Sequence, residues 1–109
     1  MIDDEKDLVD TITEYFTMKG HNIVGEGYNG YDAVTLYSEK KPDYVILDMK
    51  MPQYDGMYAI INIQKIKPDA KIFVITGHSD YDVTEMNVTK IISKPFRLNQ
   101  LIKIIEDAF

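Results

Sequence analysis

The chain contains no cysteine and carries more acidic than basic residues. Its 109 residues include 12 lysines and arginines against 18 aspartates and glutamates, which gives a net charge of -6. The absence of cysteine excludes disulfides, thiolate zinc sites and thiol nucleophiles. The acidic balance argues against nucleic acid as a direct ligand, because binding a phosphate backbone needs a basic patch.

Long hydrophobic runs are absent as well. No apolar stretch approaches the roughly 20 residues that a membrane span requires, and the N-terminus is acidic rather than a basic signal peptide. We therefore expect a cytoplasmic protein without a membrane partner. The 45% of hydrophobic residues are enough for one core, which predicts a single domain over residues 1–109 with no linker.

Short apolar runs alternate along the chain with segments of helical period. The apolar runs lie at 44–47, 72–75 and 91–92. Helical spacing of apolar residues marks segments at 8–16, 33–37, 57–63 and 98–105, and more weakly at 81–87. Continuous apolar strands between helices are typical of a parallel sheet covered on both faces. The alternation predicts an α/β fold with a doubly wound parallel sheet.

The first strand of this sheet is short in the sequence. Only Met1 and Ile2 precede the acidic pair Asp3-Asp4, whereas a typical strand has about five residues. We expect either that the natural protein has several more apolar residues before Met1 or that the first strand is unusually short.

Reactive side chains stand at the ends of the apolar runs. Asp3 and Asp4 follow Ile2. Asp48 follows the run at 44–47, Thr76 follows the run at 72–75, and Lys94 lies two residues after the run at 91–92. The carboxyl ends of parallel strands meet at one edge of the sheet, where open α/β folds bind ligands. The spacing therefore predicts one site that combines three carboxylates, a hydroxyl and an ammonium group.

The composition of this site favours a hard cation and a phosphoryl group. Three adjacent carboxylates repel one another unless a cation enters or one acid stays protonated. Oxygen ligands without histidine or cysteine favour Mg²⁺, which leaves coordination positions for phosphate oxygens. Lys94 adds a positive charge suited to phosphoryl oxygens. A carboxylate of this cluster could therefore attack phosphorus.

Four motifs in register resemble the receiver domain of two-component response regulators, of the chemotaxis-regulator type. They are MIDDE at 1–5, LDMKMP at 47–52 followed by DG at 55–56, VITG at 74–77 and SKPF at 93–96. The resemblance covers nearly the whole chain. It implies a flavodoxin-like fold with five parallel strands in the order 2-1-3-4-5 and helices on both faces.

The resemblance also implies roles for the site residues. Asp48 would accept a phosphoryl group from a histidine kinase or a phosphotransfer protein, and Thr76 and Lys94 would engage the phosphoryl oxygens and switch the surface that controls a downstream target. The module would assist its own phosphorylation and dephosphorylation without being an enzyme in the usual sense.

A magnesium site follows from the same resemblance. Asp4, Asp48 and the backbone carbonyl of Lys50 would hold Mg²⁺, with Asp3 acting mainly through a water molecule. The Lys94-Pro95 peptide bond is often cis in this family.

Some positions depart from the family pattern. Ile91 stands where an aromatic residue is usual, and the interval between Thr76 and Lys94 is about four residues shorter, which removes roughly one helical turn. We therefore expect a short helix within this interval and a monomer or weak homodimer. Tyr81 is a weak candidate for a substitute switch aromatic, and Lys50 and His78 occupy positions that tune the phosphoryl lifetime.

Other classes of protein share parts of this pattern. The main alternative is a receiver-like interaction module that signals without phosphorylation. A phosphohydrolase of the haloacid dehalogenase type generally has a second aspartate two residues after the nucleophile, where this chain has Lys50. A flavodoxin-type electron carrier is disfavoured because the acidic loop after the first strand would repel a flavin phosphate. His21 is interpreted as an exposed polar residue, since no second ligand lies at zinc spacing.

Overall fold

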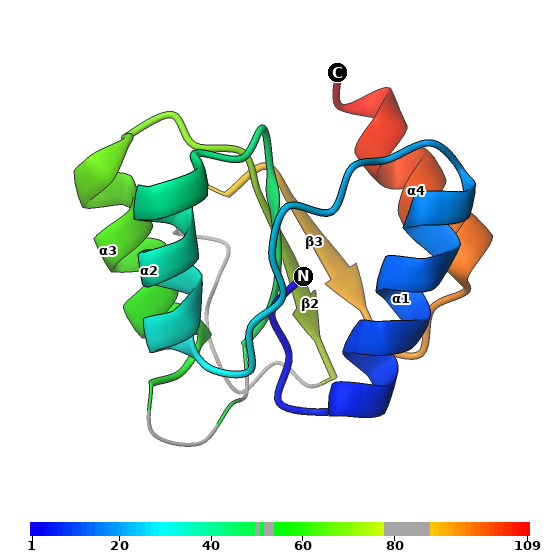
Figure 1. Cartoon of the computed structure of the whole chain (residues 1–109), viewed down its shortest axis with the longest axis horizontal. Coiled ribbons are helices and arrows are strands. Elements are labelled where there is room, and N and C mark those ends of the chain that lie inside the picture. Colours follow the sequence, from blue (N-terminus) through cyan, green and yellow to red (C-terminus); the bar gives the residue numbers. More distant parts are fainter. Residues whose placement is uncertain (50, 52–53, 78–87) are drawn as a thin grey trace.

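The sheet lies between two pairs of helices in the computed structural model of the chain. The structure describes residues 1–49, 51, 54–77 and 88–109. Helices α2 and α3 cover one face of the sheet, and α1 and α4 cover the other (Figure 1). This is the two-sided cover predicted from the alternation of strands and helices.

Three strands form the regular part of the sheet. They are β1 (Val45–Asp48), β2 (Ile72–Thr76) and β3 (Lys90–Ser93), which pair in parallel in the order β1-β2-β3. Every residue of β1 is buried, and so are the first four residues of β2. The continuous apolar runs of the sequence reflect this burial on both faces.

Two further segments extend the sheet beyond β1. Ile2 forms parallel bridges with both Leu47 and Gly27. The spatial order is therefore the Gly27 segment, the Ile2 segment, β1, β2 and β3, which follows the predicted 2-1-3-4-5 arrangement. In the described residues, however, the first two strands of that arrangement are single bridges rather than full strands. Residues 1–3 provide the segment between Gly27 and β1, and both expectations for the first strand stay predictions.

Four helices confirm the helical segments predicted from apolar spacing. They are α1 (Lys6–Met18), α2 (Gly30–Lys40), α3 (Gly56–Ile66) and α4 (Leu98–Asp107). Asn29 and Asp55 cap α2 and α3 by accepting hydrogen bonds from the third residue along the chain, as short polar side chains do at helix starts. Gly20 follows α1 with a φ of 91°, a backbone conformation that glycine adopts at little cost.

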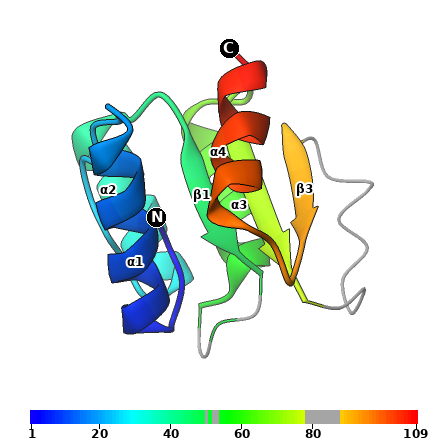
Figure 2. The same cartoon turned by 90° about the vertical axis from the view of Figure 1, so that its right-hand side faces the viewer.

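The hydrophobic core is divided by the sheet into two clusters. On the side of α2 and α3, buried residues such as Ala33, Leu47 and Ile60 pack together. On the side of α1 and α4, Phe16, Phe73 and other buried residues form the second cluster. The three strands between these clusters run parallel, so their carboxyl ends face the same edge (Figure 2).

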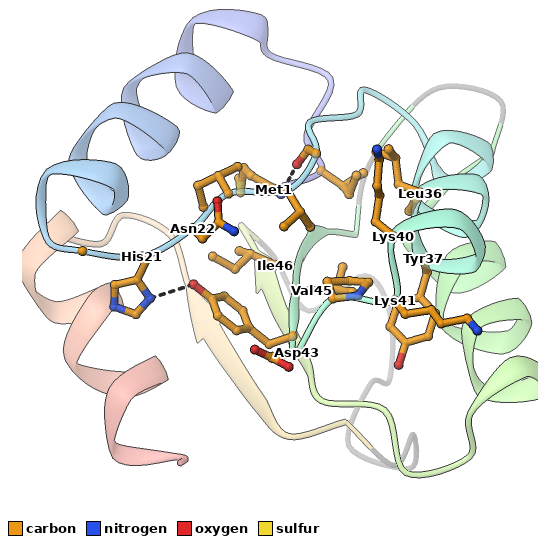
Figure 3. A pocket seen from close by; sticks show the side chains of 18 residues that line it. Met1, His21, Asn22, Leu36, Tyr37, Lys40, Lys41, Asp43, Val45 and Ile46 are labelled. Carbon is orange, nitrogen blue, oxygen red and sulfur yellow. Dashed lines mark hydrogen bonds between the residues drawn. The ribbon is translucent and has the colours of Figure 1, made fainter.

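His21 corrects one of the sequence-based expectations. Its side chain is only 19% exposed, because it lies between aromatic rings rather than in solvent. The ring of Phe16 is 5.3 Å away, and His21 Nδ1 lies 3.0 Å from the Tyr44 hydroxyl. His21 and Tyr44 both line a cavity of about 380 Å³ (Figure 3).

The predicted helical stretch at 81–87 lies outside the described residues. No helix in the described ranges is both long and apolar enough to span a bilayer.

Candidate functional site

The carboxyl edge of the sheet gathers side chains that are far apart in the sequence. Asp48 is the last residue of β1, and Thr76 is the last residue of β2. Lys94 follows β3 directly, and its N–H donates a 2.9 Å hydrogen bond to the carbonyl of Thr76. Asp3 and Asp4 follow the bridge at Ile2. The parallel direction of the strands brings all five residues to this edge.

Three carboxylates form a cluster at this edge. Asp3, Asp4 and Asp48 each offer one oxygen, and these oxygens lie within 4.8 Å of one another. Asp3 has no exposed surface and Asp48 is 4% exposed, whereas Asp4 is exposed. The cluster therefore has two buried acids and one acid that faces solvent.

The environment of Asp3 works against its ionisation. Burial raises the pKa of Asp3 to about 6, and the negative charge of Asp48 adds to the rise. The N–H of Glu5 donates a 2.9 Å hydrogen bond to Asp3 Oδ1 and opposes this shift. The second oxygen, Oδ2, is buried and accepts no hydrogen bond from the described residues. A buried carboxylate oxygen without a hydrogen bond is costly unless a cation compensates it.

Lys94 brings a positive charge to the same place. Its Nζ lies 3.7 Å from Asp3 Oδ2 and 3.6 Å from Asp48 Oδ1. These distances are too long for hydrogen bonds, so the ammonium group balances the two carboxylates electrostatically. The Lys94-Pro95 peptide bond is cis, as the resemblance implies. The side chain of Lys94 is 28% exposed, which leaves it in contact with solvent.

A close backbone contact supports the end of β1. The N–H of Gly56 donates a 3.0 Å hydrogen bond to the carbonyl of Met49. A Cβ at position 56 would lie 2.7 Å from Met49 Cα and 2.8 Å from the Asp48 carbonyl oxygen. Glycine is therefore required for α3 to begin directly beside the Asp48 backbone. Sequence reasoning recognised the Asp55-Gly56 pair as a motif but did not identify this packing role.

The donor set fits a hard divalent cation. All three side chains that approach one another offer carboxylate oxygens. Asp3 Oδ2, which is buried and accepts no hydrogen bond from the described residues, is available as a ligand atom for a cation. Oxygen donors of this kind suit Mg²⁺, which is bound through a few carboxylates and retains water ligands. The described residues can therefore hold a metal at this edge.

Several predicted positions are not described by the structure. Three of them, Lys50, His78 and Tyr81, lie outside the described residues. The metal ligand predicted at the Lys50 carbonyl and the roles predicted for His78 and Tyr81 therefore stay predictions. Ile91, which replaces the usual aromatic residue, is 39% exposed on β3. Its side chain therefore reaches the surface rather than the core.

Comparison with known proteins identifies the family to which this arrangement belongs. Residues 1–106 match the response regulator receiver domain. The chain belongs to the response regulator receiver family. This receiver domain is 31% identical to the chemotaxis protein CheY of Thermotoga maritima, over 96% of the chain and 91% of that protein. It is 38% identical to the transcriptional regulatory protein PdtaR of Mycobacterium tuberculosis over 87% of the chain, but it covers only 48% of PdtaR.

Solved structures agree with the sequence relatives. A response regulator receiver domain from Clostridium thermocellum superposes with a TM-score of 0.87 at 29% identity, covering 98% of this chain and 89% of the other. CheY in a CheX-CheY-BeF3-Mg complex from Borrelia burgdorferi gives a TM-score of 0.90 at 26% identity, covering 99% and 85%. These similarities confirm the flavodoxin-like α/β fold and the predicted family, and they assign the receiver domain to two-component signalling.

Proposed function

We propose that Asp48 is the phosphoryl acceptor of a receiver domain that occupies the whole chain, residues 1–109. The observation that carries this proposal is the position of its carboxylate. Asp48 ends a buried strand inside a three-carboxylate cluster, and Lys94 Nζ lies 3.6 Å from its Oδ1. Burial restricts the Asp48 side chain to one region of the site, and the nearby ammonium group of Lys94 suits a negatively charged phosphoryl donor.

The chemistry is a displacement at phosphorus. A carboxylate oxygen of Asp48 forms a bond to the phosphorus, while the bond from phosphorus to the donor group breaks and the donor leaves with its electron pair. The donor is a phosphohistidine of a histidine kinase or of a phosphotransfer protein. Water later attacks the phosphorus of the aspartyl phosphate, and the bond from phosphorus to the Asp48 oxygen breaks. Inorganic phosphate leaves and the carboxylate is restored, so the domain assists its own dephosphorylation.

Neighbouring residues bind and orient the phosphoryl group. The ammonium group of Lys94 and the hydroxyl group of Thr76 donate hydrogen bonds to the phosphoryl oxygens. Asp4, Asp48 and the carbonyl of Lys50 would hold Mg²⁺, and Asp3 would contribute through a water molecule. When bound, the ion neutralises negative charge on the transferred oxygens. Binding of the phosphoryl oxygens by Thr76 and Lys94 alters the surface that a downstream target recognises.

The remaining assignments follow from the proposed role. We expect a cytoplasmic signalling module that acts as a monomer or weak homodimer and does not bind nucleic acid directly. Its net charge of -6 supports a protein partner rather than a phosphate backbone.

Phosphorylation of Asp48 can be tested by intact-mass spectrometry. Wild type treated with acetyl phosphate and Mg²⁺ should gain about one phosphoryl mass, and this gain should disappear when Mg²⁺ is chelated. Asp48→Asn should show no gain. The exposed Asp69, between α3 and β2 and so at the opposite edge of the sheet, provides the matched control, because Asp69→Asn should label like wild type. Equal labelling of Asp48→Asn would contradict the assignment. No labelling of any variant would favour the phosphorylation-independent module.

A further inference from the structure

Three aromatic side chains are in contact at the surface beside the starts of α2 and α3. The centroid of the Tyr54 ring lies 5.5 Å from that of Tyr31 and 4.8 Å from that of Tyr58. Tyr31 is 54% exposed and Tyr54 is 43% exposed, although large apolar surfaces are usually covered. We call Tyr31, Tyr54 and Tyr58 the tyrosine patch. Tyrosine is enriched among the residues that dominate the energy of protein interfaces, so the patch is a candidate docking surface.

The tyrosine patch lies at the same edge of the sheet as Asp48. Helices α2 and α3 both begin at the end to which the strands point (Figure 1). Tyr31 is the second residue of α2, and Tyr54 lies two residues before α3. The segment that leads into α2 also passes the carboxylate cluster, because the carbonyl of Gly27 accepts a 3.1 Å hydrogen bond from the N–H of Asp3. The patch is therefore continuous with the edge that carries the site.

Backbone contacts hold the two halves of the tyrosine patch together. The N–H of Gly30 donates a hydrogen bond to the carbonyl of Tyr54. A Cβ at position 30 would lie 2.8 Å from that carbonyl oxygen, so the two loops meet only because no side chain separates them. The rings are thus presented on a fixed backbone, and little order has to be gained when a partner binds.

The charge around the tyrosine patch has one sign. Segments 26–36 and 54–64, which contain the patch, include Glu26, Asp32 and Asp55 but no lysine or arginine. The faces of aromatic rings also attract cations. Among cationic side chains, arginine has a planar guanidinium group that stacks on aromatic rings. A partner that brings an arginine to this surface is therefore favoured, whereas a second copy of the chain would present the same acidic surface.

We propose that the tyrosine patch docks the protein that donates the phosphoryl group to Asp48, by binding an arginine side chain of that donor on the rings of Tyr31 and Tyr54. A donor protein has to approach the carboxyl edge of the sheet to reach Asp48, so it comes to lie beside the patch. This proposal rests on the proposed function of Asp48 and adds the feature by which the chain selects its donor.

The docked arginine takes no part in the transfer. The bond from phosphorus to the imidazole nitrogen of the donor breaks, and this nitrogen keeps the electron pair. A carboxylate oxygen of Asp48 forms the new bond to phosphorus. The arginine instead raises the fraction of time that the phosphohistidine spends beside Asp48.

Pairs of phosphohistidine peptides with identical composition test the docking. Each peptide is helical and carries one phosphohistidine and one arginine, either on the same helical face or on opposite faces. A set of such pairs places the arginine one, two or three turns from the phosphohistidine. With wild type and Mg²⁺, the same-face peptide of at least one pair should phosphorylate Asp48 at least about threefold faster than its opposite-face partner, the factor expected for a cation over an exposed ring. Intact-mass spectrometry measures both rates.

Two double variants locate the effect. In Tyr31→Ala/Tyr54→Ala the ratio of the two rates should fall to about one, because both rings are removed. Tyr31→Phe/Tyr54→Phe is the matched control, since it keeps the rings and should keep the ratio. Both peptides are compared on the same variant, so a general change in labelling cancels. The bond from Gly30 uses the backbone of position 54 and is present in every variant.

The outcomes separate the docking from the phosphorylation itself. Equal rates from the two peptides of every pair would overturn the docking alone, provided that acetyl phosphate labels Asp48. Transfer from neither peptide under the same condition would do so too, as would a ratio that survives in the alanine variant. If acetyl phosphate does not label wild type, the proposed function fails and the docking fails with it. A wild type that sediments as a dimer, together with a monomeric alanine variant, would assign the tyrosine patch to a second copy of the chain instead.

Discussion

Asp3 is an ionisable residue held in the interior beside a second buried acid. Burial and the charge of Asp48 raise its pKa from 3.8 to about 6. A carboxyl group whose pKa is higher in the folded state than in the unfolded chain stabilises the fold least where it is ionised. With respect to this group, stability without Mg²⁺ should therefore be greatest below about pH 4, fall as the pH rises from about 4 to 6, and stay low at higher pH.

Replacing Asp3 with asparagine tests this balance. Asp3→Asn should increase the free energy of unfolding of the Mg²⁺-free protein at pH 8 by about 1–3 kcal/mol, since one pKa unit corresponds to about 1.4 kcal/mol. The gain should shrink between pH 6 and pH 4, where Asp3 becomes protonated in wild type. Urea denaturation at pH 4, 6 and 8 measures it. A gain independent of pH would show that ionisation of Asp3 is not the cause.

Lys94 and a metal ion compete for the same carboxylates. Lys94→Ala removes a positive charge 3.6 Å from Asp48 and 3.7 Å from Asp3, so the remaining cluster should attract a cation more strongly. We expect Mg²⁺ affinity to rise by at least about fivefold, because one charge at this distance contributes about 1 kcal/mol even in water. Labelling by acetyl phosphate should fall at the same time.

Titration calorimetry with Mg²⁺ measures this change. Lys90→Ala is the matched control, since Lys90 is an exposed lysine at the start of β3, the strand that Lys94 follows. The Mg²⁺ affinity of Lys90→Ala should equal that of wild type. Weaker Mg²⁺ binding by Lys94→Ala would mean that the lysine organises the cluster rather than competing for it.

At the scale of elements, α3 depends on its close start beside β1. Gly56→Ala places a Cβ 2.7 Å from Met49 Cα, a contact that requires backbone movement, whereas Gly77→Ala meets Lys94 Cδ at an ordinary 3.9 Å. We expect Gly56→Ala to lower the free energy of unfolding by about 1–3 kcal/mol, the cost typical of overpacking. Gly77→Ala should change it by less than about 0.5 kcal/mol. Thermal denaturation of both variants makes the comparison, and equal values would refute the packing role of Gly56.

The elements differ in how far the sequence could predict them. The strands that end at Asp48 and Thr76 are continuous apolar runs, and the alternating helices have clear apolar faces, so pattern alone located them. The segment before Gly27 was not predicted as a strand, because its pairing depends on Met1–Asp3 rather than on its own residues. The burial of His21 was missed for a similar reason: Tyr44, which contacts it, lies 23 residues away. Sequence spacing indicates which residues share an edge, but it does not give ring contacts between distant segments.

At the scale of the whole molecule, metal binding should be coupled to folding. The three carboxylates come from Asp3, Asp4 and Asp48, which are brought together only when the sheet forms. Mg²⁺ that binds the folded state alone should stabilise it by about 2.7 kcal/mol at a hundredfold excess over Kd. The melting temperature of wild type should therefore rise with Mg²⁺ concentration, and a chelator should reverse the rise.

Asp4→Asn provides the variant for this measurement. It removes the exposed carboxylate of the cluster without altering a buried group, so its fold should persist while its response to Mg²⁺ is reduced. Asp69→Asn should respond like wild type. If Mg²⁺ raised the melting temperature of Asp4→Asn as much as that of wild type, the stabilising ion would bind elsewhere on the acidic surface.

The parallel direction of the strands also has a consequence for protein engineering. Every chemical group of the site lies where strands end, so the connections at the opposite edge, such as the turn between α3 and β2 at 67–71, contribute no side chain to it. Pro68 and Asp69 are exposed there. A fluorescent reporter inserted between these two residues would be separated from the carboxylates by the length of the strands, so it could be carried by the protein without touching the chemistry that it is meant to observe.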